Sequence, residues 1–165
     1  MSNSVPLVYD VNVLVGAVAG GNSPFRSWPF PPPTSGNPFA DCLGVVVDAA
    51  EFGLWLSPHI MNNTARVVSE GLKWDSDRME KFPTVLVQVA DHSGGGIVEP
   101  PAVVSPCPDW EDNRILDLAA DVGALLIVSD DADLTSMSPS RGTPILRPRE
   151  FVAKIDGMRR QRRRR

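Results

Sequence analysis

The 165-residue chain has little cysteine, histidine or lysine. Neither Cys42 nor Cys107 has metal-ligand spacing around it, and the two histidines have none either, so a zinc site of the usual Cys/His kind is not indicated. Two unpaired thiols are favoured over a disulfide, which suits a reducing compartment. No apolar run approaches the roughly 20 residues of a membrane span. No positive charge precedes Arg26, so a secretory signal is not indicated. We therefore predict a soluble cytoplasmic protein.

Positive charge is scarce outside the carboxyl end. The chain has 16 basic and 20 acidic residues, and six of the basic ones stand in the last seven positions. The remainder has 10 basic against 20 acidic residues, a formal charge of −10. Like charges repel, and this end has almost nothing apolar to bury. We therefore predict one domain over residues 1–157, followed by a disordered basic tail over 158–165.

Short apolar runs alternate with helical patterns along the chain, which favours the α/β class with a parallel sheet. Strands are expected over residues 5–9, 54–56, 97–98, 124–128 and 144–146. Helices are expected over residues 12–19 and 40–52, from Pro58 onwards, between 75 and 91 with Pro83 dividing the helix or beginning its second half, over 111–122, and over 149–155.

Three features between these elements carry predictions of their own. Gly53 is expected to separate the second helix from the second strand. The proline-rich stretch 20–38 is predicted to be an ordered surface insertion that packs as a flap, because it also contains several aromatic residues. Asp109 is expected to cap the helix that follows it.

The most conspicuous acids follow predicted strands. Asp10 comes directly after the first strand, and a cluster of aspartates follows the run 124–128. Asp112 shares the apolar stripe of its helix, whereas Asp117 and Asp121 are expected to face water. Ligands of open parallel sheets bind at the carboxyl ends of the strands. Each acid alone is readily explained as a turn residue or by a favourable helix amino end, but together they indicate a site for Mg²⁺ or Mn²⁺.

Five stretches give the chain its resemblance to a known family. They are Val-Tyr-Asp-Val-Asn-Val-Leu-Val (8–15), Leu-Ser-Pro-His-Ile (56–60), Asp-Trp-Glu-Asp-Asn-Arg-Ile-Leu-Asp-Leu-Ala (109–119), Gly-Ala-Leu-Leu-Ile-Val-Ser-Asp-Asp-Ala-Asp-Leu (123–134) and Pro-Ile-Leu-Arg-Pro-Arg-Glu-Phe (144–151). In order and spacing the chain resembles the PIN-domain family, including the ribonuclease toxins of VapC-type toxin–antitoxin modules. The resemblance implies a three-layer α/β/α fold around a central parallel sheet of about five strands.

The resemblance also implies roles for individual residues. The acids expected to be catalytic and to hold the metal are Asp10, Asp112 and Asp131, with Asp133 as a further ligand. The polar residues expected to support them are Asn12, Ser129 and Asp130. The family's second acid is missing, and Asn63 stands at its position. Glu70, seven residues further along the same helix, is a poorly placed substitute.

The resemblance implies metal-dependent hydrolysis of RNA phosphodiesters, with 5′-phosphate and 3′-hydroxyl products. The protein would be the toxin of a toxin–antitoxin pair, with RNA as substrate, an antitoxin as a candidate partner, and a homodimer as its assembly. The arginines that could contact RNA phosphates or an acidic partner are Arg159, Arg160, Arg162, Arg163, Arg164 and Arg165. A solubilising end without further role is the alternative for them.

Two other functions compete with the ribonuclease. The first is a PIN-like binding module whose catalysis was weakened when asparagine replaced the second acid. The second is a phosphoryl-accepting receiver-like domain, which needs an acidic pair near the first strand and a lysine after the last strand but one. Here Asp10 is alone, and the chain's lysines, Lys73, Lys81 and Lys154, are not suitably placed. The ribonuclease is the preferred interpretation.

Overall fold

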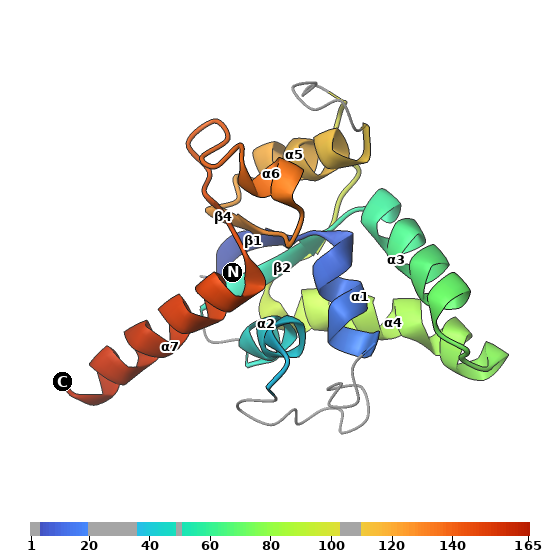
Figure 1. The fold of residues 1–165 in the computed structure, drawn as a ribbon, viewed down its shortest axis with the longest axis horizontal. Helices are drawn as coiled ribbons and strands as arrows, with labels where there is room; N and C mark the ends of the chain where they lie inside the picture. The colour runs from blue at the N-terminus through green and yellow to red at the C-terminus, as the bar shows by residue number, and fades with distance from the viewer. Residues whose placement is uncertain (1–3, 20–35, 49–50, 103–109) are drawn as a thin grey trace.

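The computed structural model describes residues 4–19, 36–48, 51–102 and 110–165 (Figure 1). Its centre is a five-stranded, all-parallel sheet with the strand order β3-β2-β1-β4-β5. The strands are β1 (Val5–Tyr9), β2 (Phe52–Leu56), β3 (Gly96–Ile97), β4 (Leu126–Val128) and β5 (Ile145–Leu146). The helices are α1 (Val11–Ala19), α2 (Pro38–Val47), α3 (Pro58–Gly71), α4 (Ser76–Ser93), α5 (Trp110–Val122), α6 (Ala132–Thr135) and α7 (Pro148–Arg163). The predicted α/β class and parallel sheet are confirmed.

Helices cover both faces of the sheet. Figure 1 shows α5 and α6 on one side, and α2 and α4 on the other. Leu7, Leu54 and Ile127, one from each of the three central strands, are buried almost completely. Burial on both faces explains why these strands are apolar runs without a polar alternation.

The strand order reverses direction beside β1. The chain proceeds from β1 outward to β2 and β3, then returns to place β4 on the other side of β1. Tyr9, the last residue of β1, is in register with Val128, the last residue of β4. The residues that follow these two strands therefore meet at one edge of the sheet, where ligands of such folds bind.

Local sequence signals explain several helix boundaries. The hydroxyl of Ser57 accepts a hydrogen bond from the backbone N–H of Ile60 at 3.2 Å, and Pro58 is the first residue of α3. Gly94 ends α4 with a φ of 90°, a conformation that glycine adopts without strain. Pro83 lies inside α4 and does not divide it.

Other boundaries differ from the sequence prediction. The second helix ends at Val47 instead of residue 52, and Gly53 lies within β2. A Cβ at Gly53 would lie 3.0 Å from backbone atoms of Gly94 and Gly95, so the close approach of the chain after α4 is the reason for this glycine. The short helix α6 was not expected, because its aspartates are also typical turn residues.

Part of the sequence prediction lies outside the described residues. This holds for residues 20–35 of the proline-rich insertion, for Asp109 and for Cys107. Cys42 is a buried free thiol, and the amide oxygen of Asn37 caps α2. Among the described residues, no helix is both long and apolar enough to cross a membrane.

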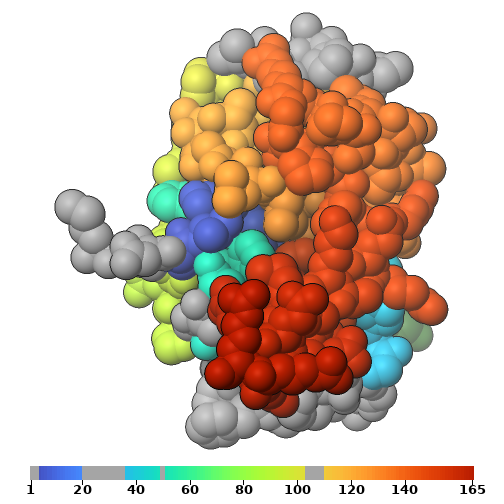
Figure 2. All heavy atoms as spheres, turned by 90° about the vertical axis from the view of Figure 1, so that its left-hand side faces the viewer, coloured from blue at the N-terminus to red at the C-terminus, as the bar shows by residue number. Residues whose placement is uncertain are grey.

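The basic end differs from the disordered tail that was predicted over 158–165, because α7 continues to Arg163. The guanidinium of Arg159 is 2.9 Å from the carboxylates of both Glu51 and Asp48, and that of Arg162 is 3.6 Å from Glu51. These acids offset the repulsion between the arginines, which the sequence pattern did not reveal. The remaining arginines of this end are exposed on the surface (Figure 2).

We predict that Arg159→Gln destabilises the protein in a pH-dependent way. Hydrogen bonds from Arg159 hold the pKa of the Glu51 carboxyl below its usual range. The pair therefore stabilises the fold above the ordinary glutamate pKa, and its contribution is lost as the pH falls through the lowered folded-state pKa. Urea denaturation at pH 7 should show a loss of about 1 kcal/mol, shrinking below about pH 4. Arg160→Gln, at an exposed position, is the control, and a loss that persists in acid would contradict the prediction.

Candidate metal centre

Three carboxylates from separate segments meet at the edge where the strand order reverses. Asp10 follows β1, Asp112 stands in the first turn of α5, and Asp131 caps α6. Each offers an oxygen, and these oxygens all lie within 4.8 Å of one another. These are three of the four acids that the sequence selected as metal ligands.

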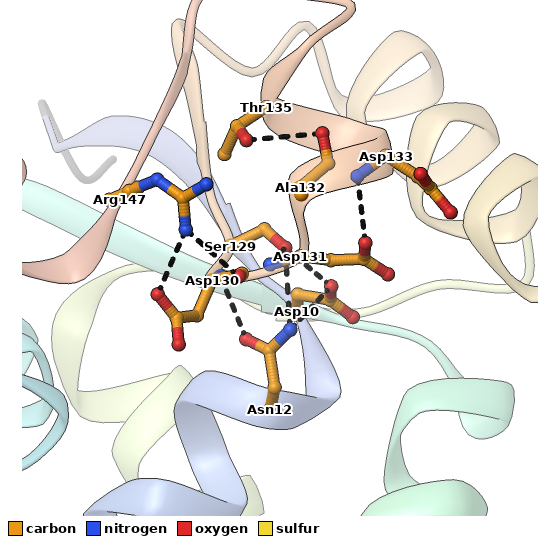
Figure 3. A network of polar contacts seen from close by, with 9 residues as sticks. All are labelled: Asp10, Asn12, Ser129, Asp130, Asp131, Ala132, Asp133, Thr135 and Arg147. Carbon is orange, nitrogen blue, oxygen red and sulfur yellow. Dashed lines mark hydrogen bonds and ion pairs between the residues drawn. The ribbon is translucent and has the colours of Figure 1, made fainter.

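Asp10 is held in place by hydrogen bonds at both carboxylate oxygens. Its Oδ1 accepts the backbone N–H of Val11 at 2.7 Å. Its Oδ2 accepts the hydroxyl of Ser129 at 2.7 Å and the side-chain amide of Asn12 at 3.1 Å (Figure 3). Each carboxylate oxygen has two lone pairs, so these contacts fix the orientation of Asp10 and still leave acceptor capacity on Oδ1.

Ser129 and Asn12 connect β1 to the turn that precedes α6. The hydroxyl oxygen of Ser129 accepts the backbone N–H of Asp131 at 3.0 Å, and Asn12 Oδ1 accepts that of Asp130 at 3.1 Å. Asp131 in turn accepts the backbone N–H of Asp133 through Oδ1 at 2.9 Å. Asn12 and Ser129, which were predicted to support the site, thus contact Asp10 and the backbone of the turn that carries Asp131 (Figure 3).

The site concentrates negative charge in a buried place. Asp10 is 8% exposed and Asp112 is 6% exposed. Burial raises the pKa of Asp10, and the charges of Asp131 and Glu111 raise it further, against hydrogen bonds from Ser129 and Val11 that lower it. A divalent cation would relieve this repulsion. Closely spaced carboxylate oxygens are the ligands that hard cations such as Mg²⁺ and Mn²⁺ prefer, so the residues present fit such an ion.

Two further aspartates of this turn face elsewhere. The carboxylate of Asp130 accepts a hydrogen bond from the guanidinium of Arg147 at 3.2 Å and is not one of the three clustered acids. The carboxylate of Asp133 points away from Asp10 (Figure 3) and also lies outside the cluster. The structure therefore places Asp133 at the amino end of α6 instead of beside the other three carboxylates.

The acidic group lies in an open cavity of about 410 Å³ between α1, α3 and α5. Asn63, which was predicted to stand at the position of the missing acid, is part of its lining. Glu70 is not: it is exposed and pairs with Arg66 at 3.3 Å, so it does not replace that acid. None of the six carboxyl-terminal arginines lines the cavity. Its lining residues are Asp10, Val11, Asn12, Val15, Gly16, His59, Asn63, Val67, Glu111, Asp112, Ile115 and Asp131.

Sequence reasoning missed two titratable residues of this cavity, Glu111 and His59. Glu111 immediately precedes Asp112, and both positions of the first turn of α5 turn out to border the cavity. His59 has no ligand spacing in the sequence. Its place in the first turn of α3, directly after the carboxyl end of β2, was the available signal.

A buried arginine connects α5 to the segment after β3. The guanidinium of Arg114 lies 3.3 Å from Asp117 and 3.0 Å from Glu99, and it also donates to the carbonyl of Pro100. Asp117 is 3% exposed, so the expectation that it faces water was wrong. Its charge is compensated by Arg114 on the same helix, and the contacts of Arg114 with Glu99 and Pro100 tie α5 to the segment after β3.

One comparison identifies a sequence family. A family model described as "PIN domain" matches residues 6–133, which include all three clustered acids. No curated protein matches the chain.

We predict that Asp131→Asn stabilises the metal-free protein at neutral pH. An asparagine retains the capping oxygen for α6 but removes one charge beside Asp10. Folding raises the pKa of Asp10, so its ionised carboxylate lowers the free energy of unfolding above the raised folded-state pKa. This cost disappears as the pH falls below the pKa that Asp10 has in the unfolded chain. In EDTA the unfolding free energy should rise by about 1 kcal/mol or less, and the gain should vanish in acid.

Thermal denaturation of the metal-free protein measures this effect. Asp133→Asn is the matched control, because it removes a charge from the same helix end but outside the acidic group. It should be neutral or slightly destabilising, since an acid at a helix amino end is favourable. Equal stabilisation by both substitutions would show that the three acids do not repel one another as proposed.

Proposed function

The chain belongs to the PIN-domain family, whose members are generally nucleases, and from that premise we propose that it is a metal-dependent endoribonuclease. The observation that carries the proposal is the group of three buried or half-buried carboxylates at the carboxyl edge of a parallel sheet. Such a concentration of buried charge is costly, and metal-assisted phosphodiester hydrolysis gives it a use, because the carboxylates can hold the cation.

The proposed division of labour follows from charge. A phosphodiester is anionic, and Asp10, Asp112 and Asp131 would repel it without a cation between them. Bound Mg²⁺ or Mn²⁺ would reverse the local sign, polarise the phosphate and make a water molecule a better nucleophile. The three carboxylates would hold that ion, and the hydrogen bonds from Ser129 and Asn12 fix the orientation of Asp10.

The absence of the second acid weakens the site without removing it. Asn63 borders the cavity and supplies an amide oxygen or nitrogen, but no charge. Glu111 borders the same cavity, and its charge acts on Asp10. We propose that Glu111 replaces part of the missing negative charge and that the protein binds its metal less tightly than a site with four acids would.

The proposed biological role is that of a toxin in a toxin–antitoxin pair, acting on RNA in the cytoplasm. The order of the acidic motifs, which resembles that of VapC-type toxins, supports this role. An antitoxin and a second copy of the chain are the proposed protein partners. The alternative is a catalytically weakened PIN-like module, and the retention of all three clustered acids argues against it.

We predict metal-dependent cleavage of end-labelled single-stranded or structured RNA by the purified full-length protein. Cleavage should occur in Mg²⁺ or Mn²⁺, stop in EDTA, and leave 5′-phosphate ends. Asp10→Asn or Asp112→Asn should reduce the rate by at least about 100-fold, because each removes a proposed ligand. Asp121→Asn, exposed on the same helix as Asp112, should cleave like the wild type. Products that persist in EDTA or in both ligand variants would exclude the proposal.

A second prediction concerns the missing acid. Asn63→Asp adds a carboxylate to the cavity lining and should lower the dissociation constant for Mn²⁺ by about tenfold, because one more negative charge lies near the cation. Isothermal titration with Mn²⁺ measures this directly. Asn62→Asp, exposed on the neighbouring position of α3, adds the same charge outside the cavity and is the control. Equal affinities for the two variants would mean that position 63 is not beside the ion.

A further inference from the structure

Trp110 is an exposed aromatic residue at the start of α5. Its side chain is 62% exposed, the largest value among the exposed large hydrophobic residues of the described ranges, and it is the only aromatic residue among them. The residues that attach α5 to the core lie further along the helix, at Ile115, Leu116 and Leu118. Packing of α5 therefore does not account for an indole at this position.

The indole is held in place by His59 of α3. The ring centroids of His59 and Trp110 are 5.0 Å apart with an interplanar angle of 82°, an edge-to-face contact. The side-chain amide nitrogen of Asn63 lies 3.2 Å from Nε2 of His59 and orients the imidazole. His59 and Asn63 both border the acidic cavity, so these three side chains lead from the carboxylates to the molecular surface.

We propose that Trp110, positioned by His59, binds an unpaired nucleobase of the RNA strand whose phosphate lies at the acidic group. The inference rests on the proposed function and extends it by naming the class of nucleotide that is recognised. Any of the four bases can stack on an indole, because each has a flat aromatic face, and this contact is a common way of binding single strands. The bases of a duplex already stack on each other, so they offer no free face to the ring.

The charges around the ring favour a neutral base over an anionic partner. Glu111 and Asp112 follow Trp110 directly in the first turn of α5. An acidic peptide would be repelled by them, and a phosphate would be repelled unless a cation were present. A nucleobase carries no charge, so it can approach the indole while the neighbouring phosphate reaches the proposed metal.

The test is RNA binding by full-length protein that carries Asp10→Asn, which prevents cleavage. Fluorescence anisotropy in Mg²⁺ with a short labelled single-stranded RNA gives the dissociation constant, and the same RNA annealed to its complement is the second probe. Trp110→Ala should raise the single-strand dissociation constant by at least about fivefold, and Trp110→Phe should restore most of the affinity. Neither substitution should change the weaker affinity for the duplex.

Leu125→Ala is the matched control. Leu125 is 60% exposed, as Trp110 is, but it lies just before β4 and does not border the cavity. It should leave both affinities unchanged. Thermal denaturation of each variant shows whether it is folded. If Trp110→Ala does not fold, Trp110→Phe, which keeps an aromatic ring, still allows the test.

The outcomes separate the two proposals. Cleavage by wild-type protein together with unchanged single-strand affinity in Trp110→Ala would overturn the nucleobase site and leave the nuclease standing. A loss of affinity confined to single strands would support the site even if no cleavage were found. An equal loss for single strands and duplex would overturn it, because an unstacked base would not be what the ring recognises.

Discussion

The pairing of β1 with β4 is the constraint on which the rest of the site depends. It sets Tyr9 beside Val128, so that the carboxylate and the hydroxyl that follow the two strands meet across 119 residues of sequence. Ser129 is fully buried at this junction and contacts Asp10, Asn12 and the backbone of Asp131. A shift of one residue in this register would turn the polar residues of one strand end away from those of the other.

The sequence predicted the strands and the acids for the same physical reason. Short apolar runs between turn residues are typical of buried strands, and an acid directly after such a strand lies at the edge of the sheet. Features that depend on contacts between distant segments were not accessible in this way. Gly53 is explained by the nearby backbone of Gly94 and Gly95, and the ordered end of α7 by Glu51. Neither of these contacts is recognisable from local spacing. The burial of Asp117 differs, because Arg114 stands three residues before it on the same helix, a spacing at which side chains meet.

The same distinction applies within the candidate site. Asp10, Asp112 and Asp131 were found because strand ends and a helix stripe place them, whereas Asp133 was included because it is close in sequence and its carboxylate faces elsewhere. His59 and Glu111 were missed because neither has a spacing that suggests a ligand or an acid pair. Whether a helix residue faces a cavity depends on how the helix is rotated, and α3 and α5 are fixed by contacts that the sequence does not show.

The hydroxyl of Ser129 has a consequence for how the acidic site moves. Its hydrogen is donated to Asp10, and its oxygen accepts the backbone N–H of Asp131, so one side chain couples two of the three carboxylate-bearing segments. A displacement of the end of β1 therefore disturbs a hydrogen bond of the turn before α6, and the reverse holds as well. The carboxylates of Asp10 and Asp131 are consequently coupled mechanically, and they do not move as independent side chains.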